Sequence, residues 1–240
     1  MQAQHVAAFS LQKSGTHLLQ ELMLALGYKI DGDACRIKPE NHASTAPDAP
    51  RCTIEHSPKI DKLSDDWLNT WCATGTPRVI FNYRDPRDAM VSFANFLCGE
   101  RDIGDIAIEQ PFRAILRSLP NMDQRLDYMI SDRSFPGHDG LRDGLWLLYH
   151  PAVCKVSYEE LVGPIGGGNQ EDQEDAVVNV MTTTGAPGNP ADIARSLYNP
   201  DAFTFRVGRI GRWREHFKLH HIEAFKREYG DVLEVYGYEW

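Results

Sequence analysis

The N-terminal part of the chain passes from a short apolar run through a polar loop to an apolar pattern of helical period. The run HVAAFSL at residues 5–11 ends abruptly in QKSGT at residues 12–16. The residues that recur at helical spacing after it are Leu18, Leu19, Leu22, Met23 and Leu26. This spacing predicts a helix, and Gly27 can form its C-cap. A loop between a strand and a helix presents unpaired backbone N–H groups at the positive end of the helix dipole, where an anion is favoured.

The same succession recurs along the chain. RVIFNY at residues 78–83 is β-branched and aromatic, which predicts a buried strand. Asp85 can then cap a helix that begins at Pro86, the position that proline favours. AVCKVSY at residues 152–158 predicts a third strand. Alternating strands and helices indicate an α/β fold with a central parallel β-sheet, helices on both faces, and ligands at the carboxyl ends of the strands.

Three further segments have a clear local character. Residues 38–51, rich in proline and alanine, are expected to form a loop. GPIGGGNQEDQED at residues 163–175 predicts a flexible, acidic surface loop that runs into a helix. WREHFKLHHIEAFKREYG at residues 213–230 predicts one amphipathic C-terminal helix. With 240 residues, of which 42% are hydrophobic, the chain is expected to form one domain over residues 1–240.

Charge and cysteine content narrow the classes of function. The net charge of −9 disfavours nucleic acid as a partner, so any anionic ligand has to be held by local arginines, lysines and backbone N–H groups. The five cysteines are widely spaced, and the absence of a C-x-x-C pair or Cys/His cluster disfavours zinc. They are typical of reduced thiols. The start of the chain lacks a basic region and a long apolar run, so we expect a soluble, cytoplasmic protein without a membrane partner.

Three short strings offer phosphate-binding chemistry. In QKSGT, Lys13 can reach a phosphate oxygen while Ser14, Gly15 and Thr16 present backbone N–H groups and hydroxyls; the alternative is an ordinary polar turn with a solvated lysine. Arg84 and Ser92 could hold a second phosphate, unless Arg84 instead pairs with Asp85 or Asp88.

FRVGRIGRW at residues 205–213 combines an arginine, two glycines three residues apart and a tryptophan, which could also serve a phosphate. The alternative is a glycine-bearing turn with a surface arginine. The first loop lacks the G-x-x-x-x-G-K-[ST] order of a nucleoside-triphosphate loop.

Taken together and in this order, the three strings resemble the motifs of the PAPS-dependent sulfotransferases of the cytosolic type. LQKSGTHL is similar to that family's Y-P-K-S-G-T-x-W, RDPRDAMVS to R-[ND]-P-x-D-x-x-x-S, and RVGRIGRW to R-K-G-x-x-G-x-W. VSYEEL at residues 156–161 and IEHSP at residues 54–58 resemble two further family stretches. The resemblance spans nearly the whole chain and implies one P-loop-like sulfotransferase domain.

The resemblance implies a donor, PAPS (3′-phosphoadenosine-5′-phosphosulfate), that leaves as PAP without need of a metal. Lys13 would contact the oxygen that bridges phosphorus and sulfur, and Tyr158 would lie near adenine. The 5′-phosphate would be cradled by Ser14, Gly15, Thr16 and His17. The 3′-phosphate would be bound by Arg84, Ser92, Arg206 and Gly208. His56 corresponds to the family's catalytic histidine and would act as general base, with Glu55 as a rival.

Several positions depart from the family pattern. Leu18 replaces the tryptophan that stacks on adenine, and Val207 replaces a lysine beside the 3′-phosphate. Lys218 and Leu219 replace the Thr-Val pair of the family's dimerisation motif, which leaves the oligomeric state open. A non-catalytic PAP-binding module and a small-molecule kinase remain alternatives to an enzyme of this family.

The acceptor is not identified by the sequence; it is expected to be a small molecule with a hydroxyl, or an amine. Residues 97–143 should contribute to its pocket. The aromatic residues that could form the wall of this pocket, or else pack in the core, are Phe96, Phe112, Tyr128, Phe135 and Trp146.

Overall fold

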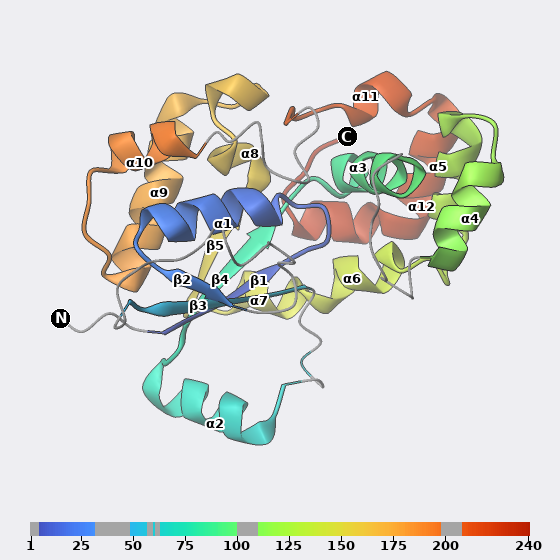
Figure 1. The fold of residues 1–240 in the computed structure, drawn as a ribbon. Coiled ribbons are helices and arrows are strands. Elements are labelled where there is room, and N and C mark those ends of the chain that lie inside the picture. The colour runs from blue at the N-terminus through green and yellow to red at the C-terminus, as the bar shows by residue number, and fades with distance from the viewer. Residues whose placement is uncertain (1–4, 32–48, 57–59, 61–62, 100–109, 198–207) are drawn as a thin grey trace. The chain divides into compact units, whose positions relative to one another are not determined.

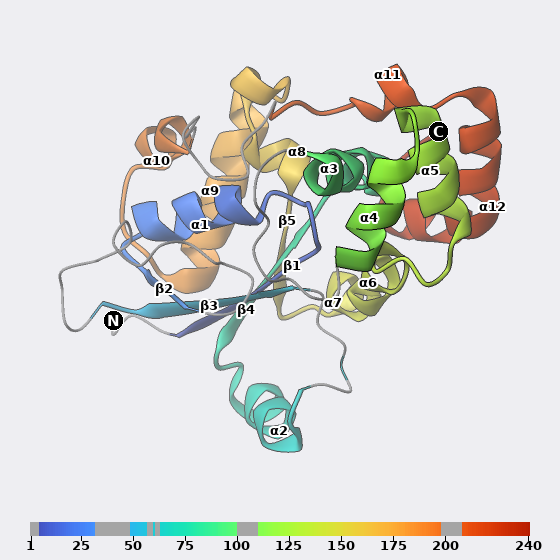
Figure 2. The ribbon, with the colours of Figure 1, turned by 45° about the vertical axis from the view of Figure 1, so that its right-hand side comes forward.

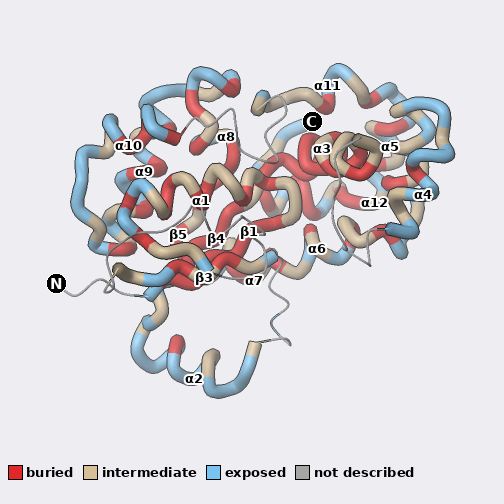
Figure 3. Tube along the Cα trace, in the orientation of Figure 1, coloured by how far each residue is buried: buried red, intermediate tan, exposed pale blue. Residues whose placement is uncertain are grey.

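Five parallel strands form a sheet within the part of the chain that the structure describes. They are β1 (Val6–Ser10), β2 (Lys29–Asp31), β3 (Arg51–His56), β4 (Arg78–Tyr83) and β5 (Val153–Ser157), in the spatial order β2-β3-β1-β4-β5. The central strands β1 and β4 are apolar and largely buried, as expected of a parallel sheet that is covered on both faces (Figure 3). The predicted α/β fold with a central parallel sheet is confirmed.

The computed structural model describes residues 5–31, 49–56, 60, 63–99, 110–197 and 208–240. The chain divides into two compact units, each described here by itself. The sheet unit comprises Met1–Arg84 and Trp146–Ile210, and the helical unit comprises Asp85–Leu145 and Gly211–Trp240. None of the helices in the described ranges has both the length and the apolar character that crossing a bilayer requires.

Helices cover both faces of the sheet. On one face lie α1 (Thr16–Ala25), α9 (Gln170–Thr184) and α10 (Pro190–Ser196), which share a core with Val6, Ala8 and Ile80 of the strands. The short α8 (Tyr158–Leu161) follows β5 directly. On the opposite face lies α2 (Asp65–Thr74), whose Trp67 contacts Phe9 of β1 edge to face (Figures 1 and 2). Trp71 of α2 stacks in turn on His150, which follows α7 (Leu145–Tyr149).

The helical unit is built around two pairs of packed helices. α3 (Pro86–Cys98) packs against α4 (Gln110–Ser118), and α5 (Met122–Ser131) packs against α12 (Leu219–Val235). Phe225, Tyr229 and Val232 form the buried stripe of α12. α6 (Gly137–Asp143) is tied to the chain after α12 by a hydrogen bond from the Tyr236 hydroxyl to the Leu141 carbonyl. Asp85 caps α3 and Pro86 is its first residue, as predicted.

The expected single helix over residues 213–230 is interrupted. α11 (Trp213–His216) ends before Phe217, whose backbone is extended, and α12 starts at Leu219. The backbone N–H of Lys218 donates to Nδ1 of His221, an arrangement that caps α12 from within the predicted helix. The prediction of one helix was therefore wrong because apolar spacing alone does not reveal a side chain that caps a new start.

The glycine-rich segment after α8 leads into α9, as predicted, and forms backbone hydrogen bonds of its own. Pro164–Gly166 form a 3₁₀ turn, and the Gly166 carbonyl accepts a hydrogen bond from the backbone N–H of Ile210. A Cβ at Gly166 would lie 2.3 Å from the Gly208 carbonyl oxygen, so only glycine allows these two segments to approach. Most of the predicted loop over residues 38–51 lies outside the described residues, and its last residue begins β3.

Truncation of a core leucine in α1 should destabilise the protein far more than truncation of its half-buried neighbour. Leu22 is fully buried in the core between α1 and the sheet, whereas Leu24 on the same helix is only partly covered. Leu22→Ala should lower the free energy of unfolding by about 2 to 5 kcal/mol through lost apolar burial and a residual cavity. Urea denaturation of both variants measures the difference. Equal losses for Leu22→Ala and Leu24→Ala would contradict the packing described here.

Candidate functional site

The loop between β1 and α1 has a backbone conformation suited to an anion. Lys13 (φ 65°) and Gly15 (φ 82°) are left-handed on either side of Ser14, and α1 begins at Thr16. Among the described residues, Lys13 is the only non-glycine residue with a positive φ, a conformation that costs about 1 to 3 kcal/mol. Such strain commonly marks sites where the backbone is arranged around a ligand. Loops of this kind direct successive N–H groups into a concavity that binds anions.

A buried amide holds the loop to the sheet. Nδ2 of Asn82, at the end of β4, donates to the Ser14 carbonyl (2.9 Å) and to Oγ of Ser10 (3.0 Å). The Ser10 hydroxyl also bonds to that of Thr16 at 2.9 Å. Ser14 Oγ is buried without a hydrogen-bond partner in the described part of the chain. A buried hydroxyl in that condition, within an anion-binding loop, fits a phosphate oxygen supplied by a ligand.

The Tyr158 ring contacts both Gly15 of the loop and the Arg84 guanidinium. A Cβ at Gly15 would lie 2.5 Å from Cδ2 of Tyr158, so the glycine is required both for its φ and for this close contact. The Arg84 guanidinium carbon lies 4.0 Å from the centre of the Tyr158 ring. Arg84 is buried, and it donates to the carbonyls of Lys13 (3.4 Å) and Arg209 (3.1 Å). The structure thus brings the first loop, Arg84 and Tyr158 together within the sheet unit.

His56 ends β3 beside the last residue of β1. Its Nδ1–H donates to the Ser10 carbonyl at 3.1 Å, which leaves Nε2 as the nitrogen with the lone pair. Burial lowers the pKa of His56 from its ordinary value, the hydrogen bond to Ser10 opposes this shift, and the positive charge of Lys13 lowers the pKa further. The Lys13 charge therefore acts on this imidazole, and His56 is neutral at neutral pH.

Glu55 and His56 belong to opposite faces of the sheet. In the register between β1 and β3, His56 is paired with Ser10 and Glu55 with Phe9. Ser10 bonds to Thr16 at the start of α1, whereas Phe9 contacts Trp67 of α2 on the other face. Side chains paired in a parallel register share a face, so His56 lies on the face of the phosphate-type loop.

The other predicted site residues lie in different parts of the chain. Thr16 and His17 are the first two residues of α1. Gly208 lies beside Gly166, to which its carbonyl oxygen is close. Ser92 is a half-buried residue of α3 and belongs to the helical unit. Arg206 and Val207 lie outside the described residues.

Asp85 and Asp88, the two acids that the sequence offered as partners of Arg84, each make contacts within the helical unit. The Asp85 carboxylate accepts three hydrogen bonds from the Arg87 guanidinium, and this guanidinium stacks on the Trp213 ring at 4.0 Å. Asp88 accepts from the backbone N–H groups of Gly211 (2.7 Å) and Trp213 (2.8 Å). The sequence offered Asp88 only as a possible partner of Arg84, and its hydrogen bonds to the backbone of residues 211 and 213 were not predicted.

Three of the aromatic residues proposed for an acceptor wall, Phe96, Phe112 and Phe135, belong to one aromatic cluster around Phe93 in the helical unit. Phe135 is buried and packs against Phe93 and Phe112, within the helical unit. Trp146 instead contacts Trp71 in the sheet unit. Core packing accounts for Phe135, which is buried.

The fold resembles that of a known sulfotransferase. The mouse sulfotransferase SULT7A1, whose structure was solved in complex with PAP, superposes with a TM-score of 0.65 over 96% of this chain and 85% of its own. The sequences are 16% identical, so the likeness establishes the sulfotransferase fold and not the activity. No protein-family model and no curated protein sequence matches the chain.

The electrostatic link between Lys13 and His56 can be tested without any ligand. NMR titration of the imidazole protons should place the pKa of His56 below the ordinary value of about 6.5. Lys13→Met should raise it, because a positive charge that disfavours the imidazolium is removed. Lys155→Met, on β5 and three strands away in the sheet, is the control and should leave this pKa unchanged. A His56 pKa that does not respond to Lys13→Met would contradict the site geometry.

Proposed function

We propose that this protein is a sulfotransferase that moves a sulfonate group from PAPS to a hydroxyl, or an amine, of a small molecule and releases PAP. One observation carries the proposal: the carboxyl ends of three neighbouring strands present a lysine-bearing anion loop after β1, an imidazole with a basic Nε2 on β3, and a buried arginine after β4. Ligands of parallel α/β sheets bind at this edge. The sulfotransferase fold supports the same assignment.

The donor would be held by charge and by backbone N–H groups. The loop Ser14–Gly15–Thr16, with His17, offers donors for the 5′-phosphate, and the partnerless Ser14 hydroxyl supplies one of them. Arg84 is assigned to the 3′-phosphate; the family resemblance adds Ser92, Arg206 and Gly208 to it. Tyr158 is assigned to the neighbourhood of adenine, where it and Arg84 already stack on each other.

The chain's own residues supply acid–base and charge chemistry for the transfer. The acceptor oxygen forms a bond to sulfur while the bond from sulfur to the bridging oxygen of the donor breaks. The acceptor proton passes to Nε2 of His56, which is neutral at neutral pH because burial and Lys13 lower its pKa. Lys13 offsets the negative charge that grows on the bridging oxygen, a contribution made in the transition state.

Recognition of the 3′-phosphate is the first test. PAP should bind much more tightly than 5′-AMP, since a hydrogen bond to a charged group contributes about 1.5 to 3 kcal/mol. Arg84→Ala should remove most of that preference, whereas Arg78→Ala, at the exposed start of the same strand, should keep it. Isothermal titration calorimetry in EDTA measures all three proteins and also shows whether binding needs a metal. Equal affinity of the unaltered protein for PAP and 5′-AMP would refute the assigned donor site.

Transfer by a histidine base is the second test. His56→Ala should lower turnover by roughly 10²- to 10⁴-fold while PAP still binds, because general-base catalysis contributes about that factor. Glu55→Gln should lose far less, since Glu55 shares a face with Phe9. For the unaltered enzyme, kcat/KM should fall on the acid side with a pKa below about 6.5, because a protonated imidazole cannot accept the acceptor's proton.

Labelled PAPS and a panel of phenols, sugars and amines provide the assay. An inactive Glu55→Gln with an active His56→Ala would reverse the two roles. PAP binding without transfer to any acceptor would leave a PAP-binding module.

A further inference from the structure

A glycine-rich loop, residues 163–168, joins α8 to α9 within the sheet unit. The backbone N–H of Gly168 donates to the Gly163 carbonyl at 2.8 Å, which closes the loop on itself. Nε2 of the buried Gln173, on α9, donates to the Leu161 carbonyl at the end of α8, also at 2.8 Å. The loop is therefore held by its own backbone and by both neighbouring helices, and the proposed transfer chemistry gives it no role.

The loop carries a short backbone segment, residues 208–210, which we call the strap. The Ile210 backbone N–H donates to the Gly166 carbonyl at 3.0 Å. A Cβ at Gly166 would overlap the Gly208 carbonyl oxygen. Gly166 is not among the residues with a positive φ, so its backbone conformation would accept alanine and only contacts forbid a side chain there. The loop and the strap are thus held at a separation that glycine alone permits.

The strap in turn orients the Arg84 side chain. One terminal nitrogen of the Arg84 guanidinium donates to the Arg209 carbonyl at 3.1 Å, and the other donates to the Lys13 carbonyl at 3.4 Å. The guanidinium carbon lies over the Tyr158 ring. Because a guanidinium is planar and its N–H groups form a fixed fork, two carbonyls and a ring together determine where its remaining N–H groups point. A displaced strap would remove one of these three supports.

We propose that Gly166 is a specificity-determining position for the donor nucleotide. By letting the strap lie against the glycine-rich loop, it fixes the Arg209 carbonyl and so aims Arg84 at the 3′-phosphate of PAP. This inference rests on the proposed function, which assigns Arg84 to that phosphate. Gly166 acts through the strap and through Arg84, so it is a positioning residue. The loop thereby helps the site to distinguish PAP from nucleotides that lack a 3′-phosphate.

Gly166→Ala tests this role directly. The added Cβ meets the Gly208 carbonyl oxygen, which belongs to the backbone and can yield only if the strap moves. The ratio of PAP affinity to 5′-AMP affinity, measured by isothermal titration calorimetry, should fall by roughly tenfold or more, as expected from the loss of one hydrogen bond to a charged group. The affinity for 5′-AMP itself should be retained, because the loop assigned to the 5′-phosphate, residues 13–17, makes none of these contacts with Gly166.

Two control variants separate this effect from general damage. Gly185→Ala puts alanine at φ 70° after α9, where its Cβ meets nothing within 4 Å; it strains the backbone without touching the strap and should keep the ratio. A Cβ at Gly166 would also overlap the Val162 side chain. Val162→Ala alone should therefore keep the ratio, whereas Gly166→Ala/Val162→Ala should lose it, because the overlap with Gly208 remains. The double variant carries the test if Gly166→Ala does not fold.

Three results with folded variants would overturn the inference and leave the proposed function standing. Gly166→Ala could keep the full preference for PAP. The double variant could regain that preference, which would make Val162 the reason for the glycine. PAP and 5′-AMP could lose affinity equally, which would indicate damage to the whole site. If instead the unaltered protein has no preference for PAP over 5′-AMP, the assigned donor site is refuted and this inference falls with it.

Discussion

The candidate site depends on one buried side chain, the amide of Asn82. It is fully buried at the end of β4, and its two N–H bonds reach the loop backbone at Ser14 and the hydroxyl of Ser10. Because a loop with left-handed residues at Lys13 and Gly15 is strained, it needs such bonds to remain in a single conformation. The same network places Thr16 at the start of α1 and the Ser10 carbonyl opposite His56. Anion loop and imidazole are thus positioned by a common set of hydrogen bonds.

Much of the R-D-P-R-D string serves the fold rather than a ligand. Arg84 is held in the sheet unit between Tyr158 and two carbonyls, while the residues that follow it belong to the helical unit. There, Asp85 caps α3 and forms an ion pair with Arg87. Asp88 accepts hydrogen bonds from the backbone N–H groups of Gly211 and Trp213. The similarity of this string and of GRIGRW to family motifs is therefore explained in part by their bonds to each other.

An acidic chain that is proposed to bind an anion has to concentrate its positive charge. The net charge is −9, yet the loop edge of the sheet presents Lys13 and the buried Arg84. Burial lowers the pKa of the His56 imidazole, and the positive charge of Lys13 lowers it further. Binding of an anion at this edge would therefore follow from the local arrangement of charge and not from the overall charge.

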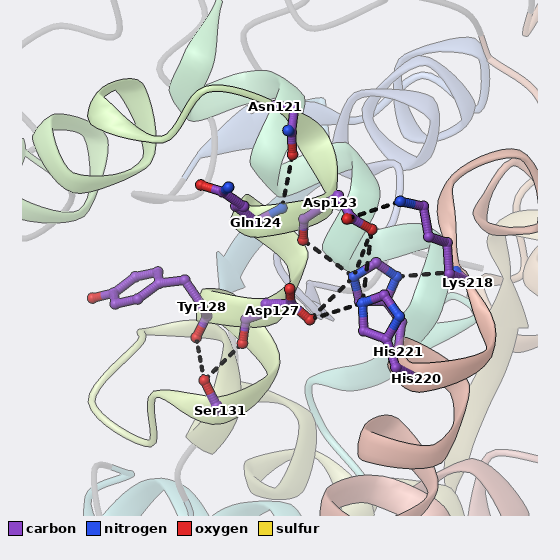
Figure 4. A network of polar contacts seen from close by, with 9 residues as sticks. All are labelled: Asn121, Asp123, Gln124, Asp127, Tyr128, Ser131, Lys218, His220 and His221. Atoms are coloured by element: carbon purple, nitrogen blue, oxygen red, sulfur yellow. Dashed lines mark hydrogen bonds and ion pairs between the residues drawn. The ribbon is translucent and has the colours of Figure 1, made fainter.

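The sequence by itself determined the features that arise within a few residues. The apolar run of β4, the Asp85 cap before Pro86 and the loop at Lys13 were predicted because propensity, capping and glycine conformation act locally. Only the tertiary structure decided what depends on partners far along the chain. The Nδ1–H bond of His56 needs a carbonyl on β1, and the break before α12 needs His221 in its capping position. The hydrogen bond from His221 Nε2–H to the Asp123 carbonyl joins α12 to α5 across almost a hundred residues (Figure 4), and no local pattern of hydrophobicity or charge encodes that approach.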